Sequence, residues 1–138
     1  MLDILKSLPL EGSAWALAIL FGIHEFEEWN ILDWYKRHYV GLPPSTKFST
    51  RLHIVVLSAA ALGLISLAAA LRSTPAFGVV IAALSIFIAV NSIQHVIWSF
   101  QTRSYSPGLA TGLLLLSATM LANAAFVAQG GIDPWLYL

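Results

Sequence analysis

One histidine and three carboxylates occur close together near the N-terminus, in a segment that continues a helical run of apolar residues. On a helix, His24 shares a face with Glu28 and, on its other flank, with Glu27, whereas Glu25 points elsewhere. A histidine and a carboxylate within one turn can bind one metal ion together, or one can bind it while the other orients the ligand. Taken alone, the same residues would also suit a hydrogen-bonded interior histidine beside a solvated helix end.

The composition indicates that this segment lies in a membrane protein. Of 138 residues, 58% are hydrophobic and 10% are charged, which leaves too few polar side chains to coat a soluble domain of this size. The chain has no cysteine, so a metal would have to bind to histidine, carboxylate or amide groups. Net charge is zero and the basic residues are scattered, which makes nucleic acid an improbable partner.

Four segments are predicted to cross the membrane, and together they predict an all-α, single-domain, four-helix transmembrane bundle over residues 1–138. A helical span needs about 20 mostly apolar residues. The predicted spans are approximately 13–34, 52–71, 76–98 and 109–128, and the last three contain no Asp, Glu, Lys or Arg.

The first span differs from the others because its purely apolar stretch, Ala14 to Ile23, has only ten residues. To cross the bilayer, this helix must continue through the acidic cluster to about Leu32 or Tyr35, which takes the carboxylates into the membrane. A short, tilted or re-entrant helix, with its carboxylates among the lipid headgroups, is the alternative.

The loop charges predict the orientation, because Lys and Arg collect on the cytoplasmic side of membrane proteins. Five of the seven basic residues lie on one side of the predicted bundle and two lie on the other: Lys36, Arg37, Lys47, Arg51 and Arg103 against Lys6 and Arg72. Both termini are therefore expected to be non-cytoplasmic, with Trp135 and Tyr137 as interfacial anchors after the fourth span.

Antiparallel helices would bring the polar residues of all four spans into one layer at the cytoplasmic side. In the third span, Asn91 and His95 repeat the four-residue spacing. Facing helices of a bundle are where metal sites are built. The residues that this layer adds as orienting or substrate-contacting candidates are His53, Arg51, Tyr105 and Ser106.

Three segments resemble a known family. The run His24-Glu25-Phe26-Glu27-Glu28 resembles the signature of the HXXEE family of small membrane proteins. Residues 91–95 are similar to that family's later asparagine and histidine pair, and residues 106–111 to its proline-glycine segment, with Ser106 where threonine is frequent. The resemblance implies a four-helix membrane protein that binds metal and implies no particular reaction. The functional positions that it implies are His24, Glu27, Glu28, Asn91 and His95.

The leading hypothesis is a membrane-embedded metalloenzyme with His24, Glu28 and His95 as ligands and Glu27 as a further ligand or the catalytic base. Two histidines and a carboxylate suit zinc-dependent hydrolysis and also oxidation with ferrous iron. A membrane lipid or another apolar molecule, entering from the side, is the expected substrate, and a homo-oligomer is possible. The alternatives are a proton- or ion-handling transporter subunit and a non-enzymatic membrane protein that binds a partner.

Overall fold

The computed structural model of the protein describes residues 2–74 and 76–130, and the regular structure within them is entirely helical, as predicted. Trp135 and Tyr137, the predicted anchors, lie outside the described residues. The helices are α1 (Leu2–Ser7), α2 (Leu10–Glu27), α3 (Ile31–His38), α4 (Lys47–Ala70), α5 (Ala76–Thr102) and α6 (Leu109–Ala128).

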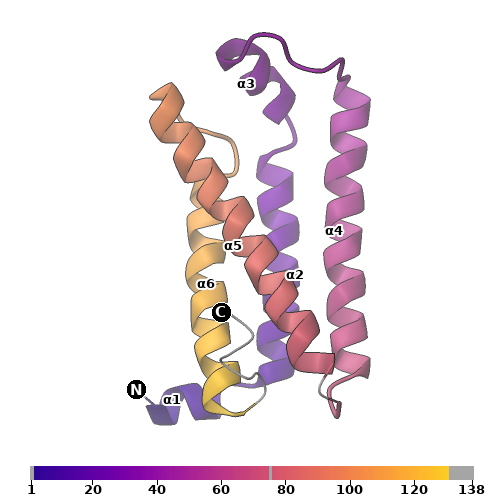
Figure 1. Ribbon diagram of the computed structural model, residues 1–138, viewed down its shortest axis with the longest axis vertical. Helices are drawn as coiled ribbons and strands as arrows, with labels where there is room; N and C mark the ends of the chain where they lie inside the picture. The colour runs from indigo at the N-terminus through magenta and orange to yellow at the C-terminus, as the bar shows by residue number, and fades with distance from the viewer. Residues whose placement is uncertain (1, 75, 131–138) are drawn as a thin grey trace.

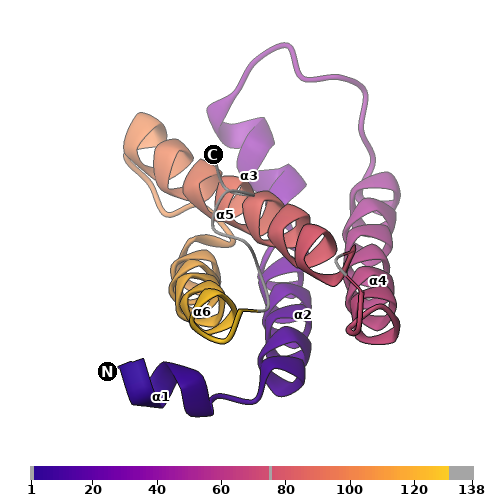
Figure 2. The ribbon, with the colours of Figure 1, turned by 60° about the horizontal axis from the view of Figure 1, so that its bottom comes forward.

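The four long helices lie side by side, with α1 at one end of the molecule and α3 at the other (Figure 1). Of these helices, α2 packs against α4 and α6, and α5 packs against the same two helices (Figure 2). Because neighbouring helices alternate in direction, the end of α2, the start of α4, the end of α5 and the start of α6 all lie at the end that carries α3. We refer to this end of the molecule as the α3 end.

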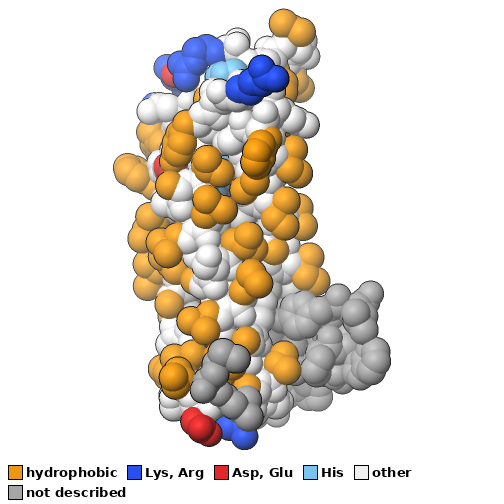
Figure 3. Space-filling view, turned by 90° about the vertical axis from the view of Figure 1, so that its left-hand side faces the viewer, with side chains coloured by type: hydrophobic (Ala, Val, Ile, Leu, Met, Phe, Trp, Pro, Cys, Tyr) orange, Lys and Arg blue, Asp and Glu red, His pale blue; other side chains and the backbone are white. Residues whose placement is uncertain are grey.

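Three helices, α4, α5 and α6, are long and apolar enough to cross a membrane. Hydrophobic side chains cover the long middle part of the face shown in Figure 3, whereas Lys and Arg side chains lie near its two ends. Large apolar side chains such as Val90 and Met120 are exposed in these helices. A surface of this kind is consistent with an integral membrane protein, since lipid tails would cover the apolar side chains that would otherwise be exposed to water.

The interior between the α3 end and the α1 end is filled with apolar side chains. Phe21, Ile65, Ile88, Leu115 and Phe126 are completely buried there and come from all four long helices. Small residues in the same interior, among them Ala61 and Ala125, allow the helices to approach closely.

The first long helix is shorter than the predicted span of 13–34, because it ends at Glu27 and does not continue to Leu32 or Tyr35. The backbone N–H of Glu28 is shared between the carbonyls of His24 and Glu25, which tightens the last turn. Asn30 then departs from helical geometry, with φ −116° and ψ 22°.

This break has a clear structural result, since it starts a separate helix, α3, that runs in a new direction. Three apolar side chains of α3, those of Ile31, Leu32 and Trp34, are buried as a consequence. A continuous helix would have carried them straight past the end of the bundle.

The second long helix, α4, begins five residues before the predicted position 52, at Lys47. Thr46 caps it, because the Thr46 hydroxyl accepts from the Ser49 N–H while the Ser49 hydroxyl accepts from the Thr46 N–H, each at 3.0 Å. Lys47 also donates to Asp33 at 2.7 Å, which lowers the pKa of Asp33 and ties α3 to α4.

Candidate metal centre

Two histidines and one glutamate meet inside the α3 end. His24 and Glu28 come from the end of α2, and His95 comes from α5. Glu28 Oε1 lies 3.1 Å from His24 Nε2 and 2.8 Å from His95 Nε2, and one donor atom from each of the three lies within 4.8 Å of the others. Ligands on one tetrahedral zinc ion, bonded at about 2.0 to 2.1 Å, are separated by roughly 3.3 Å. The spacing of these donors therefore suits a single metal ion.

The three side chains are closed off from solvent, since His24 is 0% exposed, His95 1% and Glu28 8%. Glu28 Oε1 has no hydrogen-bond partner of good geometry, although both ring nitrogens are near it. A buried carboxylate oxygen without such a partner is costly. A cation placed between the three donors would remove that cost.

The contacts of His24 Nδ1 suit one of its two neutral tautomers. The Thr111 hydroxyl lies 2.5 Å from Glu27 Oε2 and donates to it, so its oxygen is left to accept from His24 Nδ1 at 3.0 Å. A neutral His24 with its proton on Nδ1 fits this contact. In that tautomer the Nε2 lone pair would face Glu28, which is the arrangement that a metal-binding histidine needs.

The second histidine has a similar arrangement. Ser106, which is fully buried, directs its hydroxyl proton to the Pro107 carbonyl at 3.3 Å and places its oxygen 3.3 Å from His95 Nδ1. With His95 Nδ1 as the donor, its Nε2 would be an acceptor facing Glu28. With both rings in this tautomer, two nitrogen lone pairs and a carboxylate oxygen would converge on one point, as metal ligands do.

Glu27 lies beside this group and does not contribute a donor atom to it. Its carboxylate accepts from the Thr111 N–H at 3.0 Å, from the Thr111 hydroxyl and from the Tyr105 hydroxyl. Three donors around one carboxylate suit its ionised form. Glu27 is therefore linked to His24 by hydrogen bonds through Thr111.

Asn91 is also part of the cluster, because its Oδ1 lies 2.6 Å from His24 Nε2. As placed, the amide oxygen would accept from a proton on Nε2. Turned about, the amide would instead donate to His24 from its nitrogen.

The remaining candidates occupy different places. Tyr105 reaches the cluster through Glu27, and Ser106 reaches it through His95. His53 is exposed on α4 and lies outside the group of donors. Arg51 contacts Trp29 and Asn30 instead.

Two glycines of the last helix make room for the imidazole rings. A Cβ atom on Gly108 would lie 2.7 Å from His95 Cε1 and 2.9 Å from His24 Cε1, and one on Gly112 would lie 3.3 Å from His24 Cε1. Gly108 also has a φ of +88°, which glycine adopts most readily. The two histidines therefore pack against the bare backbone at the start of α6.

A layer of aromatic rings from α5 and α3 packs on His95. The ring of Trp98 lies 5.0 Å from the His95 ring, and Trp34 and Tyr35 pack on Trp98 at 6.1 and 5.2 Å. Burial, with the nearby charge of Glu28, raises the pKa of Tyr35, which keeps its hydroxyl protonated. The break after α2 thus places the aromatic rings of α3 next to the cluster.

Glu25 is buried as well, at 2% exposure, and its Oε1 has no hydrogen-bond partner in the described part of the chain. It lies one turn before Glu28 on the same helix but outside the group of three donors. Its carboxyl is a further buried acid next to the candidate metal centre.

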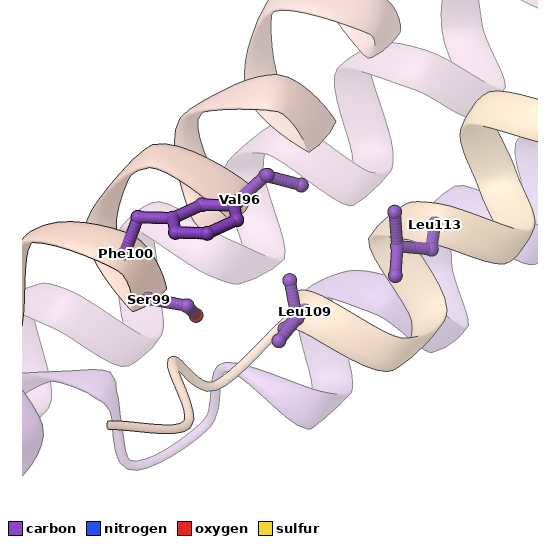
Figure 4. Close-up of a pocket in the computed structure, with 5 residues that line it drawn as sticks. All are labelled: Val96, Ser99, Phe100, Leu109 and Leu113. Carbon is purple, nitrogen blue, oxygen red and sulfur yellow. The ribbon is translucent and has the colours of Figure 1, made fainter. Parts of the chain in front are cut away.

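An apolar groove opens between α5 and α6 near the cluster, with a volume of about 310 Å³ (Figure 4). Its lining is Val96, Ser99, Phe100, Leu109 and Leu113. The Ser99 hydroxyl accepts from the Ser106 N–H at 3.1 Å, and Ser106 in turn contacts His95. The groove is thus separated from His95 by two serines.

Fold and site together define a class: an all-helical protein with three membrane-competent helices and a buried His-Glu-His group that could hold a metal. The chain belongs to the HXXEE family, described as a protein of unknown function with HXXEE motif, which matches residues 15–122. The resemblance seen in the sequence is thereby confirmed. Comparisons with curated proteins and with solved structures gave no match.

The structure separates the roles of the three motif positions. His24 and Glu28 belong to the donor group, whereas Glu27 binds Thr111. Sequence reasoning did not single out Thr111. The available signal was its position three residues after Gly108, in the segment that resembles the family, which places both on the same face of α6.

Proposed function

We propose that the protein is a membrane-embedded, metal-dependent enzyme that acts on a lipid or another apolar substrate at His24, Glu28 and His95. One observation carries the proposal. Both imidazoles are held through Nδ1 by hydroxyl oxygens, so that both Nε2 atoms face the same buried oxygen of Glu28. Fixing the remote ring nitrogen is how proteins prepare histidines for metal.

In this proposal α2 is the fourth membrane-spanning helix. Its 18 residues give a length of about 27 Å, close to the thickness of the hydrocarbon region. A charged group in that region costs about 2.5 to 3.5 kcal/mol on insertion scales. Glu28 is buried between two histidines, and half-buried Glu27 is held by three donors, which supports carboxylates that face protein rather than lipid.

The ligand set would leave at least one coordination position open. A bound zinc ion would acidify water for hydrolysis, and ferrous iron would support oxidation. Glu27 would hold Thr111, and with it His24, in the binding orientation. The groove of Figure 4 would admit the apolar part of a substrate from the side of the bundle, next to the serines that contact His95.

The interior supports an enzyme over a transporter. Between the donor group and the α1 end, the buried positions are filled mainly by apolar side chains, including Phe21, Ile65 and Leu115. The polar contact that lies among them, Ser85 with Asn123 at 2.9 Å, contains no ionisable group. An ion or proton path would need polar groups at both ends.

The test is the metal content of the protein, purified in mild detergent without a histidine tag and measured by inductively coupled plasma mass spectrometry. We expect close to one zinc or iron per chain in the wild type and loss of most of it in His24→Ala, Glu28→Ala and His95→Ala. His53→Ala is the matched control, because it removes an exposed histidine outside the donor group.

Glu27→Gln belongs in the same experiment. We expect it to keep the metal, because Glu27 contacts Thr111 and Tyr105 rather than the donor atoms. Loss of metal in this variant would place Glu27 among the ligands. Folded protein with no metal after loading with zinc or ferrous iron, or with a metal content that the three alanine variants leave unchanged, would overturn the proposal.

A further inference from the structure

A second groove lies between α2 and α4, on the other side of the motif helix. Its volume is about 330 Å³. Its lining is Gly22, Phe26, Trp29, Ile54, Val55, Ser58, Ala59 and Leu62. Gly22 and Phe26 point about half a helical turn away from His24 and Glu28, so this groove does not open toward the candidate metal centre.

The side chain of Arg51 lies at the α3 end of this groove. Arg51 precedes Ile54 and Val55 on α4 by one turn, and its guanidinium carbon lies 5.0 Å from the centre of the Trp29 ring. Arg51 Nε donates to the Trp29 carbonyl at 3.4 Å, and another guanidinium nitrogen donates to Asn30 Oδ1 at 3.0 Å. The guanidinium is thus held in place at one end of the apolar groove.

No carboxylate in residues 2–74 and 76–130 balances the charge of Arg51. Both of its acceptors are neutral, and no described carboxylate lies within ion-pair distance of it. Lys47, one turn earlier, is paired with Asp33. Since a guanidinium has five N–H donors, Arg51 keeps donors for a further acceptor.

We propose that this groove binds an anionic phospholipid, with its phosphate on Arg51 and one acyl chain along Phe26, Val55 and Leu62. Arginine recognises phosphate with two parallel hydrogen bonds. Tryptophan and arginine near the end of a membrane-spanning helix lie at headgroup level. An apolar groove that begins at that level and continues along α4 toward its middle fits a lipid tail.

The test is native mass spectrometry of the detergent-purified full chain, titrated separately with phosphatidylglycerol and phosphatidylcholine. We expect one tightly retained phosphatidylglycerol, with an affinity about tenfold or more above that for phosphatidylcholine, because the choline cation offsets the phosphate charge that Arg51 would bind. Arg51→Gln should remove this preference. Gly22→Leu should weaken the binding of both lipids, because a side chain at this position meets no atom within 4 Å and would extend into the groove.

Lys36→Gln is the charge-matched control, since Lys36 is exposed on α3 and does not line the groove. It should bind phosphatidylglycerol as the wild type does. Equal loss in Arg51→Gln and Lys36→Gln would show a diffuse charge effect, and an unchanged preference in Arg51→Gln would show that Arg51 does not hold the phosphate. Either result would overturn the proposal. The outcome is independent of metal content, because Arg51 does not contact the donor group.

Discussion

The two hydroxyl groups that hold the imidazoles do more to define this site than their residue types suggest. The Thr111 hydroxyl donates its hydrogen bond to Glu27, so its oxygen can accept a hydrogen bond from His24 Nδ1. The Ser106 hydroxyl oxygen lies in a similar position next to His95 Nδ1. Each hydroxyl thereby fixes the ring nitrogen that faces Glu28. The motif and its hydrogen-bond partners therefore orient the histidines as well as supplying the metal-binding atoms.

The role of Thr111 can be measured directly. Thr111→Val keeps the size of the side chain and removes the acceptor, so His24 loses the group that fixes its tautomer. We expect metal affinity, measured by competition with a chelator, to fall roughly 10- to 100-fold, as loss of such partners typically does. Thr111→Ser should bind nearly as the wild type does. Equal affinities for the valine variant and the wild type would rule out this role.

Most of the donor residues could be predicted from the sequence, because ionisable groups are conspicuous in an apolar chain. His24 and Glu28 follow from helical spacing, and His95 from antiparallel helices that return it to the same layer. Thr111 could not be found in this way, since hydroxyl residues are common in membrane helices and gain meaning only from their partners. The burial of Glu25 was also not foreseen, because helical spacing turns its side chain about 100° away from that of His24.

At the scale of helices, the start of α6 is the element that closes the site. Gly108 and Gly112 let its backbone touch both imidazole rings. Small residues four apart in a membrane helix indicate by themselves only that helices pack closely. The space next to these glycines is occupied by imidazole rings of other helices rather than by their backbones. This contact depends on the tertiary structure.

Gly108→Ala should therefore damage the site. The new methyl group would lie well inside contact distance of both rings, at a positive φ that alanine adopts poorly. We expect loss of bound metal and a lower thermal midpoint of unfolding. Gly63→Ala, at a position with nothing within 4 Å, should leave both quantities unchanged. Metal retention in Gly108→Ala would show that the rings can move away from α6 without harm.

The ends of the elements show where sequence patterns stop being informative. Long apolar runs predicted α4, α5 and α6 well, since length and composition alone decide such segments. The break at residues 28–30 was missed because what it achieves, the burial of Trp34 and its neighbours against other helices, is a tertiary contact that no local signal encodes. The early start of α4 could have been read from Thr46 and Ser49, which form a capping box.

At the scale of the whole molecule, charge distribution predicts orientation. The five basic residues of the majority side lie toward the α3 end, whereas Lys6 and Arg72 belong to the elements at the other end. The candidate metal centre would then lie near the cytoplasmic leaflet, with both termini on the opposite side.

The absence of cysteine from the chain makes this orientation testable. Single cysteines at Ser45, between α3 and α4, and at Ser73, between α4 and α5, would occupy exposed positions. A membrane-impermeant maleimide applied to intact cells should label Ser73→Cys at once and Ser45→Cys only after permeabilisation. The opposite pattern would reverse the orientation, and labelling of both from one side would show that α4 does not cross.

The cluster joins parts of the chain that are synthesised far apart in time. His24 contacts Asn91 and Thr111, which follow it by 67 and 87 residues. While α2 leaves the ribosome, His24 and Glu28 have none of their partners from α5 and α6. The helix that carries the motif is thus made early but can settle only after the last helix has arrived. Metal loading would follow completion of the chain, and nascent chains arrested before Thr111 should hold none.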